Sequence, residues 1–190
     1  MIFFTSDHHF GHARIILLDE RPFKTIQEHD EYLIQKWNET VKPEDTVYHL
    51  GDYAFGPLDQ QIRIKGRLNG NIILIRGNHD GSQTRMEKIF STVIKREMAI
   101  DFHGRKVLLR HRPYHFPVEE DTSDQHDWLI HGHTHKHGQQ VKGRMINVNV
   151  LFWDWKPVSE EQILGIMKKG ENPWWKQLLR RLQWRRKKAD

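Results

Sequence analysis

Cysteine is absent from this sequence of 190 residues. Disulfide bonds, thiolate metal sites and catalysis by a cysteine nucleophile are therefore excluded. Long apolar runs are absent as well, so no segment has the length needed to cross a bilayer as a helix. The apolar residues 2–4 at the N-terminus are too few to form the core of a signal peptide. We therefore expect a cytoplasmic protein.

An excess of positive charge is absent from most of the chain. The net charge is +5, but residues 1–170 contain 23 basic and 23 acidic residues, whereas residues 171–190 contain seven and two. We expect one domain over residues 1–170 and a basic amphipathic C-terminal helix or tail over residues 171–190. This tail is a candidate site for nucleic acid or an anionic membrane surface. The alternative that we favour is a terminal helix that docks through Trp174 and Trp175.

Histidine occurs fourteen times, and several histidines lie just beyond predicted strands. Residues 2–5, 46–50 and 72–75 are short apolar segments typical of buried strands. They end, in order, at Ser6-Asp7-His8-His9, Gly51-Asp52 and Gly77-Asn78-His79-Asp80. In α/β proteins, binding sites lie in the loops beyond strand ends. The three polar clusters are therefore expected to meet.

The remaining segments predict an α/β protein in one domain. Residues 25–40 have helical spacing, with Thr25 as the cap, and residues 159–169 are a second helix. Strands are expected at residues 98–102 and 106–109, joined by a turn at His103-Gly104, and at residues 128–130 and 145–150. Residues 112–127 are expected to form a long loop beside the site. Periodicity does not decide between one sheet and two.

Each short motif is weak evidence by itself, because polar turns are common. His111 follows a predicted strand, and His133 and His135 alternate, which places both rings on one side of an extended segment. Taken in order, the fragments are Asp-x-His, Gly-Asp, Gly-Asn-His-Asp, a single His and Gly-His-x-His. This series resembles the calcineurin-like metallophosphoesterase superfamily. The run Asp7-His8-His9-Phe10-Gly11-His12 and the segment 147–159 are similar to its small bacterial and phage-type members.

The resemblance implies two packed mixed β-sheets flanked by helices, with two divalent metal ions. It assigns Asp7, His9 and His135 to one ion and Asn78, His111 and His133 to the other, with Asp52 bridging both. Imidazole with carboxylate and amide oxygens suits manganese, which we expect, or iron, zinc, nickel or cobalt, better than magnesium.

The resemblance also implies the reaction. A hydroxide that bridges the two metals attacks the phosphorus of a phosphate ester. His79 resembles the family's catalytic histidine, which stabilises charge on the phosphate or protonates the leaving group. His12 and Arg112 are candidates for contacts with the substrate. His8, His131 and His137 are expected to point away from the metals.

One departure from the family narrows the expected substrate. Protein Ser/Thr phosphatases of the superfamily carry Gly-Asp-x-Val-Asp-Arg-Gly, whose second Asp orients the catalytic histidine. Here Phe55 stands in its place and the Arg is missing. A protein phosphatase is therefore not expected, and His79 needs another partner, for which Asp80 is a candidate.

We accordingly expect hydrolysis of a phosphodiester of a small molecule or nucleotide. A nuclease acting on DNA or RNA is the first alternative, because the basic tail could hold a phosphate backbone. A non-catalytic scaffold on the same fold is the second, and the complete set of ligands argues against it. The sequence gives no indication of the oligomeric state.

Overall fold

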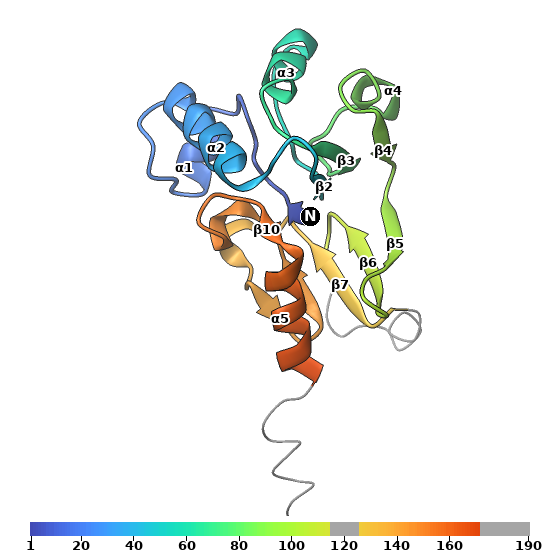
Figure 1. Ribbon diagram of the computed structural model, residues 1–190. Coiled ribbons are helices and arrows are strands. Elements are labelled where there is room, and N and C mark those ends of the chain that lie inside the picture. The colour runs from blue at the N-terminus through green and yellow to red at the C-terminus, as the bar shows by residue number, and fades with distance from the viewer. Residues whose placement is uncertain (115–125, 172–190) are drawn as a thin grey trace, which may run out of the picture.

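Two five-stranded sheets form the centre of the computed structural model, which describes residues 1–114 and 126–171 (Figure 1). The first sheet has the order β10-β1-β2-β3-β4, with bounds Val158–Ser159, Ile2–Thr5, Thr46–His49, Asn71–Ile75 and Thr92–Ile94. Strands β1 to β4 are parallel, and β10 is antiparallel to β1. This sheet confirms the three strands predicted in the first half of the chain.

The second sheet is also mixed and has the order β5-β6-β7-β9-β8. Its strands are Glu97–Asp101, Lys106–Arg110, Trp128–His131, Met145–Asn147 and Val141–Lys142. The central strands β6, β7 and β9 are parallel, whereas β5 and β8 pair antiparallel at the edges. The turn between β5 and β6 lies at His103 and Gly104, which both have positive φ. The predicted hairpin is therefore confirmed, as are the two mixed sheets that the resemblance implied.

Helices of the described residues flank the sheets: α1 (Ile15–Leu18), α2 (Ile26–Thr40), α3 (Leu58–Lys65), α4 (Gln83–Met86) and α5 (Glu160–Glu171). The cap of α2 is Thr25, as predicted, and its side chain accepts a hydrogen bond from the backbone N–H of Glu28. Short 3-10 turns occupy His135–His137 and Val150–Phe152. None of the helices in the described part is long and apolar enough to span a membrane.

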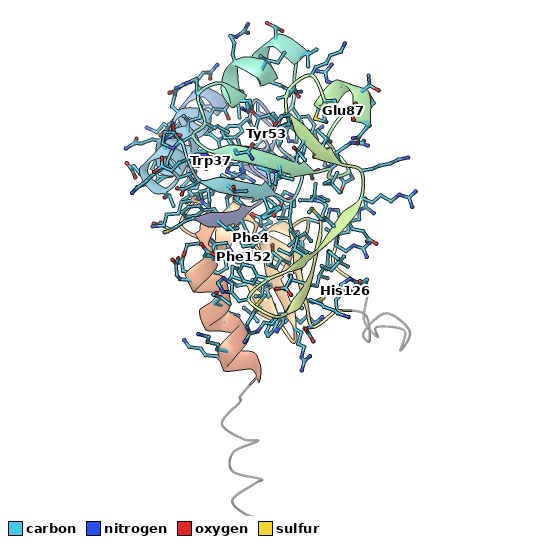
Figure 2. The ribbon with its side chains drawn as sticks, turned by 45° about the vertical axis from the view of Figure 1, so that its right-hand side comes forward. Phe4, Trp37, Tyr53, Glu87, His126 and Phe152 are labelled. Atoms are coloured by element: carbon cyan, nitrogen blue, oxygen red, sulfur yellow. The ribbon has the colours of Figure 1, made fainter. Side chains whose placement is uncertain are left out.

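The core has two main layers because successive strand residues face opposite sides of a sheet. Phe3 packs with Trp37, Tyr53 and neighbouring residues between the first sheet and its helices. Phe4 packs with the second sheet and α5, and its ring meets that of Phe102 edge-on at 5.4 Å. Figure 2 shows Trp37 and Tyr53 in the part covered by α2 and α3, and Phe4 nearer the centre.

Three predictions about the second half of the chain have different outcomes. The strand predicted over residues 145–150 ends at Asn147, because the Asn149 side chain accepts the backbone N–H of Leu151 and starts a 3-10 turn. This part of the prediction was wrong. The predicted loop 112–127 and the basic tail 171–190 lie largely outside the described residues, so neither prediction is tested.

The parallel arrangement places several strand ends together. The last residues of β1 and β2, Thr5 and His49, are paired, and the loops that follow are joined by the hydrogen bond from Asp7 N to Gly51 O. The second sheet reaches the same place, because the His111 ring bonds to the carbonyl of Leu50. All the predicted polar clusters therefore lie at one junction of the two sheets.

Candidate metal centre

Two groups of side chains at this junction can each hold a metal ion. Asp7, His9, Asp52 and His135 form the first group, and Asp52, His111 and His133 form the second. Within each group one ligand atom per residue lies within 4.8 Å of the others. Asp52 belongs to both groups, which is the arrangement that a bridging carboxylate requires.

The distances around Asp52 show how the groups adjoin. Its Oδ2 atom lies 3.6 Å from Nε2 of His9 and 3.3 Å from Nε2 of His111. Oδ2 is buried, yet accepts no hydrogen bond of good geometry from the described residues. A buried carboxylate oxygen without a partner is costly, and a cation at this position would satisfy it. The donor set therefore fits divalent metal ions.

Asn78 joins the second group. Its Oδ1 lies 3.1 Å from Nε2 of His111, and Nδ1 of His133 lies 3.2 Å from the same nitrogen. Three possible ligand atoms thus converge within a few ångströms, with Asp52 beside them. The structure brings all seven residues expected as ligands to one place.

The backbone around these residues is unusual. Five of the seven have φ between 44° and 72°, in the left-handed region that non-glycine residues seldom adopt: Asp7, His9, Asp52, His133 and His135. Such conformations cost about 1–3 kcal/mol each and cluster at functional sites. The surrounding fold therefore holds these side chains in place at a cost to stability.

Glycine is required where two of the loops touch. Gly51 has φ +89°, and a Cβ there would lie 2.8 Å from Nδ1 of His111 and closer still to the backbone of Gly77. A Cβ at Gly77 would collide with the Asp52 carboxylate. These contacts explain why Gly precedes both Asp52 and Asn78.

Hydrogen bonds fix which ring nitrogens face the centre. Nδ1 of His111 donates to the carbonyl of Leu50 at 2.7 Å, and Nδ1 of His135 donates to Asp19 at 2.7 Å. Each bond turns Nε2 toward the other residues of the ligand group. Such partners set the tautomer and orientation of metal-binding histidines.

Asp19 belongs to a buried polar network that the sequence analysis missed. The guanidinium of Arg21 donates to Asp19, to the backbone carbonyls of Asp7 and His8, and to His29. Residues 19 and 21 lie in a short loop without periodicity, where charged side chains are normally solvated. No local signal in a single sequence distinguishes this buried pair from exposed charges.

Asp80 has a different role from the one considered for it. Its carboxylate accepts the backbone N–H groups of Asp52, Tyr53 and Gly77 at 2.7–2.9 Å. It therefore holds the loop of Asp52 against the loop of Asn78, and its oxygens are occupied. The idea that Asp80 orients His79 was wrong, and no carboxylate in the described part bonds to the His79 ring.

The charges of the centre are strongly coupled. Burial opposes ionisation of Asp52, but the His111 imidazole beside it holds the pKa of the carboxyl below its usual value. Burial disfavours protonated His111, but the Asp52 and Asp7 carboxylates raise its pKa to about 9. Burial lowers the pKa of His133 to about 4. The His111 ring is therefore protonated and positively charged at neutral pH. A bound metal cation would replace that positive charge.

The residues expected to act on the substrate border this centre. His79 is exposed, its ring lies 5.7 Å from that of His9, and its backbone N–H donates to Asp52 at 2.9 Å. His12 is half-buried and stacks on Phe55 with ring centroids 4.0 Å apart. Phe55, where protein phosphatases have Asp, lies between His12 and His79.

Arg112 and His133 line a pocket of about 520 Å³. His131 and His137 line the same pocket, and neither belongs to a ligand group. His8 points into the core, where its ring packs on Trp37 and bonds to His49. His8 therefore points away from the ligand groups, as expected, whereas the orientation expected for His131 and His137 stays a prediction.

Comparison with known proteins agrees with this architecture. Residues 1–150 match the family profile described as the calcineurin-like phosphoesterase superfamily domain. The chain is 36% identical over 183 residues to the uncharacterized protein MJ1445 of Methanocaldococcus jannaschii, covering 90% of this chain and 93% of that protein. It is 32% identical over 200 residues to the gene 66 protein of Mycobacterium phage L5, covering 86% and 92%.

A solved structure is also similar. The protein of unknown function AQ665 from Aquifex aeolicus superposes with a TM-score of 0.71 at 32% identity, over 87% of this chain and 98% of that one. The phage relative agrees with the resemblance to small bacterial and phage-type proteins. The profile matches residues 1–150 and so includes every residue of the candidate metal centre. The chain therefore belongs to the calcineurin-like phosphoesterase superfamily.

Proposed function

We propose that this protein hydrolyses a phosphodiester of a small molecule or nucleotide with the help of two divalent metal ions. Membership of a phosphoesterase superfamily supports the general reaction. The proposal of two metal ions is supported by the position of Asp52. This residue belongs to both ligand groups, and its buried Oδ2 has no hydrogen-bond partner among the described residues.

The proposed ligands divide as the two groups do. Asp7, His9 and His135 would hold one ion, and Asn78, His111 and His133 the other, with Asp52 between them. When bound, two such ions stabilise the phosphate oxygens and acidify a water for attack on phosphorus. The bonds to Asp19 and Leu50 keep His135 and His111 turned toward the centre.

His79 is proposed as the catalytic side chain that faces the substrate. Its exposure and its place beside His9 leave the ring free to contact a phosphate oxygen or the leaving group. The hydrogen bond from its backbone to Asp52 fixes the loop without restraining the ring. His12 and Arg112 are proposed substrate contacts on either side, because both border the centre and neither belongs to a ligand group.

Manganese is the proposed native metal. The donor set combines imidazole nitrogens with carboxylate and amide oxygens, which suits manganese, iron, zinc, nickel or cobalt better than magnesium. A nuclease is the second candidate function, and the observation that favours it is the seven basic residues among residues 171–190. The cytoplasmic location remains a prediction, which cell fractionation would test.

The hydrolysis of two chromogenic esters tests the proposal. The full chain, purified without chelator, is assayed with bis(p-nitrophenyl) phosphate and p-nitrophenyl phosphate. We expect the diester to be the better substrate, chelation to abolish turnover, and manganese to restore it better than magnesium. Activity that persists in excess chelator, or no hydrolysis of either ester with manganese, would contradict the proposal.

A further inference from the structure

A second pocket, of about 330 Å³, borders the proposed metal centre at Asn78 and His111. It lies where the end of β3, the crossover from β4 to β5 and the end of β6 meet. The crossover runs along the right-hand edge in Figure 1. Five basic side chains and one carboxylate surround this basic pocket: Arg76, Lys95, Arg96, Arg110, Arg112 and Glu97.

Within the described part of the chain, most of these cations have no acidic partner. Arg110 lies 3.6 Å from Glu97, its cross-strand neighbour, and also covers the ring of Tyr114. No carboxylate of residues 1–114 and 126–171 forms an ion pair with the other four, which are Arg76, Lys95, Arg96 and Arg112. Among the described residues, the basic pocket therefore has more positive than negative charge.

Arg76 is a second indication that the basic pocket binds an anion. Its Nε atom is buried and has no hydrogen-bond partner in the described part of the chain. A buried donor without an acceptor lowers stability, as does the approach of several like charges. An anion in the basic pocket would relieve both effects.

This concentration of charge does not reflect a generally basic surface. Residues 1–170 contain equal numbers of basic and acidic side chains, and several exposed cations elsewhere are paired, for example Arg67 with Glu31 and Lys136 with Glu20. In the basic pocket, by contrast, five basic side chains lie around a single carboxylate, next to two proposed metal ligands. Focused charge of this kind attracts and orients anionic ligands.

We propose that the basic pocket binds a second phosphate group of the substrate, so that the substrate class is a compound with at least two phosphates. This inference rests on the proposed function, which places the scissile phosphate at the metals. Asn78 and His111 are proposed metal ligands and also line the basic pocket. A phosphate bound in the basic pocket is therefore close to the phosphate that reacts at the metals. Arginine pairs with phosphate through two parallel hydrogen bonds, which suits this role.

The volume limits what the basic pocket can contain. About 330 Å³ is at the lower end of small-ligand pockets, enough for one phosphate with its sugar or a similar group. Arg112 also lines the larger pocket next to His133. A phosphodiester bound at the metals would thus place one of its two ester substituents in each pocket. The substituent that contains the second phosphate would lie in the basic pocket. Nucleotides with two phosphates and short stretches of a nucleic acid backbone share this chemistry.

The test compares ligands that differ by one phosphate. Binding of the dinucleotide TpT, of pTpT, of TpTp and of a ten-residue oligothymidylate is measured by calorimetry. The protein is the full chain loaded with manganese and carrying His79→Asn to suppress turnover. The same titrations are made after adding Lys95→Ala and Arg96→Ala, both at exposed positions. The matched control adds Lys168→Ala and Lys169→Ala, which remove two exposed cations from α5.

We expect pTpT or TpTp to bind at least about tenfold tighter than TpT. The preference should disappear with the Lys95 and Arg96 changes and survive the α5 control. If pTpT or TpTp binds as tightly as the oligothymidylate, the second phosphate belongs to a small substrate with two phosphates. If the oligothymidylate binds far more tightly and its binding depends on Lys95 and Arg96, the second phosphate belongs to a nucleic acid chain. Equal affinity for TpT and both phosphorylated forms, or a preference unchanged by the two substitutions, would overturn the inference.

The reaction is tested separately. Hydrolysis of bis(p-nitrophenyl) phosphate, which has a single phosphate, should change less than twofold in the Lys95 and Arg96 variant of the otherwise unchanged chain. If the unchanged chain hydrolyses no ester but still shows the phosphate-dependent binding, the proposed function fails and the basic pocket stands. If hydrolysis occurs without that binding preference, the pocket assignment alone fails.

Discussion

Asp19 and His135 are joined by a hydrogen bond of 2.7 Å between the carboxylate and Nδ1 of the ring. The residues are 116 positions apart in the sequence, and the bond turns Nε2 of His135 toward Asp7, 3.6 Å away. Arg21 holds Asp19 from the other side. A residue outside every recognised motif thus positions one of the proposed ligands.

Replacing Asp19 by Asn should weaken the first metal group selectively. The amide keeps the size of the side chain but loses the charge that favours the Nδ1–H tautomer and strengthens the ring as a ligand. Metal affinity should fall by about 10–100-fold, as for other partners of metal-binding histidines. Competition with a chelating dye measures the change.

Glu20→Gln is the matched control for this substitution. Glu20 is adjacent, exposed, and pairs with Lys136, the neighbour of His135, at 2.6 Å. Its loss removes the same charge from the same loop without touching the ring. Equal effects of the two substitutions would show that Asp19 acts only through the general charge of the loop.

Metal uptake should release protons. The pKa of His111 is raised to about 9 in the metal-free chain, so its ring is protonated at pH 7, whereas a metal ligand must be neutral. Below pH 9, affinity should rise with pH by about tenfold per unit for each proton displaced, and level off above pH 9. Calorimetry in buffers of different ionisation enthalpy counts these protons. Uptake without proton release between pH 6 and 8 would contradict the proposed role of His111.

His79→Asn separates metal binding from chemistry. The ring is exposed and belongs to neither ligand group, so metal content should stay unchanged while turnover falls by roughly 10²–10⁴, as for loss of a general acid. The loss should shrink for a nitrophenyl ester, whose leaving group needs no proton. An undiminished loss would indicate charge stabilisation instead, and loss of a metal ion would make His79 a ligand.

The strands that carry the site were predictable because their signals are local. An apolar run that stops at Gly-Asp or Gly-Asn-His is visible in a few residues, and β1, β2 and β3 follow these runs closely. The order of such fragments predicts seven ligands, and the structure brings these residues together. Their division between two ions is still a prediction.

Long-range contacts were not predictable in this way. The division into two sheets depends on the pairing of β10 with β1 and on the crossover between β4 and β5, which leave no periodic pattern. Asp19 and Arg21 are buried only because the loop folds over the ends of β1 and β7. The role of Asp80 as an acceptor for three backbone N–H groups also depends on loops that are distant in the sequence.

The metal content of two variants tests the central claim most directly. The full chain, Asp52→Asn and His135→Ala are purified with manganese, and the bound ions per chain are counted by plasma mass spectrometry. Because Asp52 belongs to both ligand groups and His135 to one, we expect two ions in the unchanged chain, depletion of both in Asp52→Asn, and about one in His135→Ala. Two retained ions in Asp52→Asn would contradict the shared carboxylate and the dinuclear centre built around it.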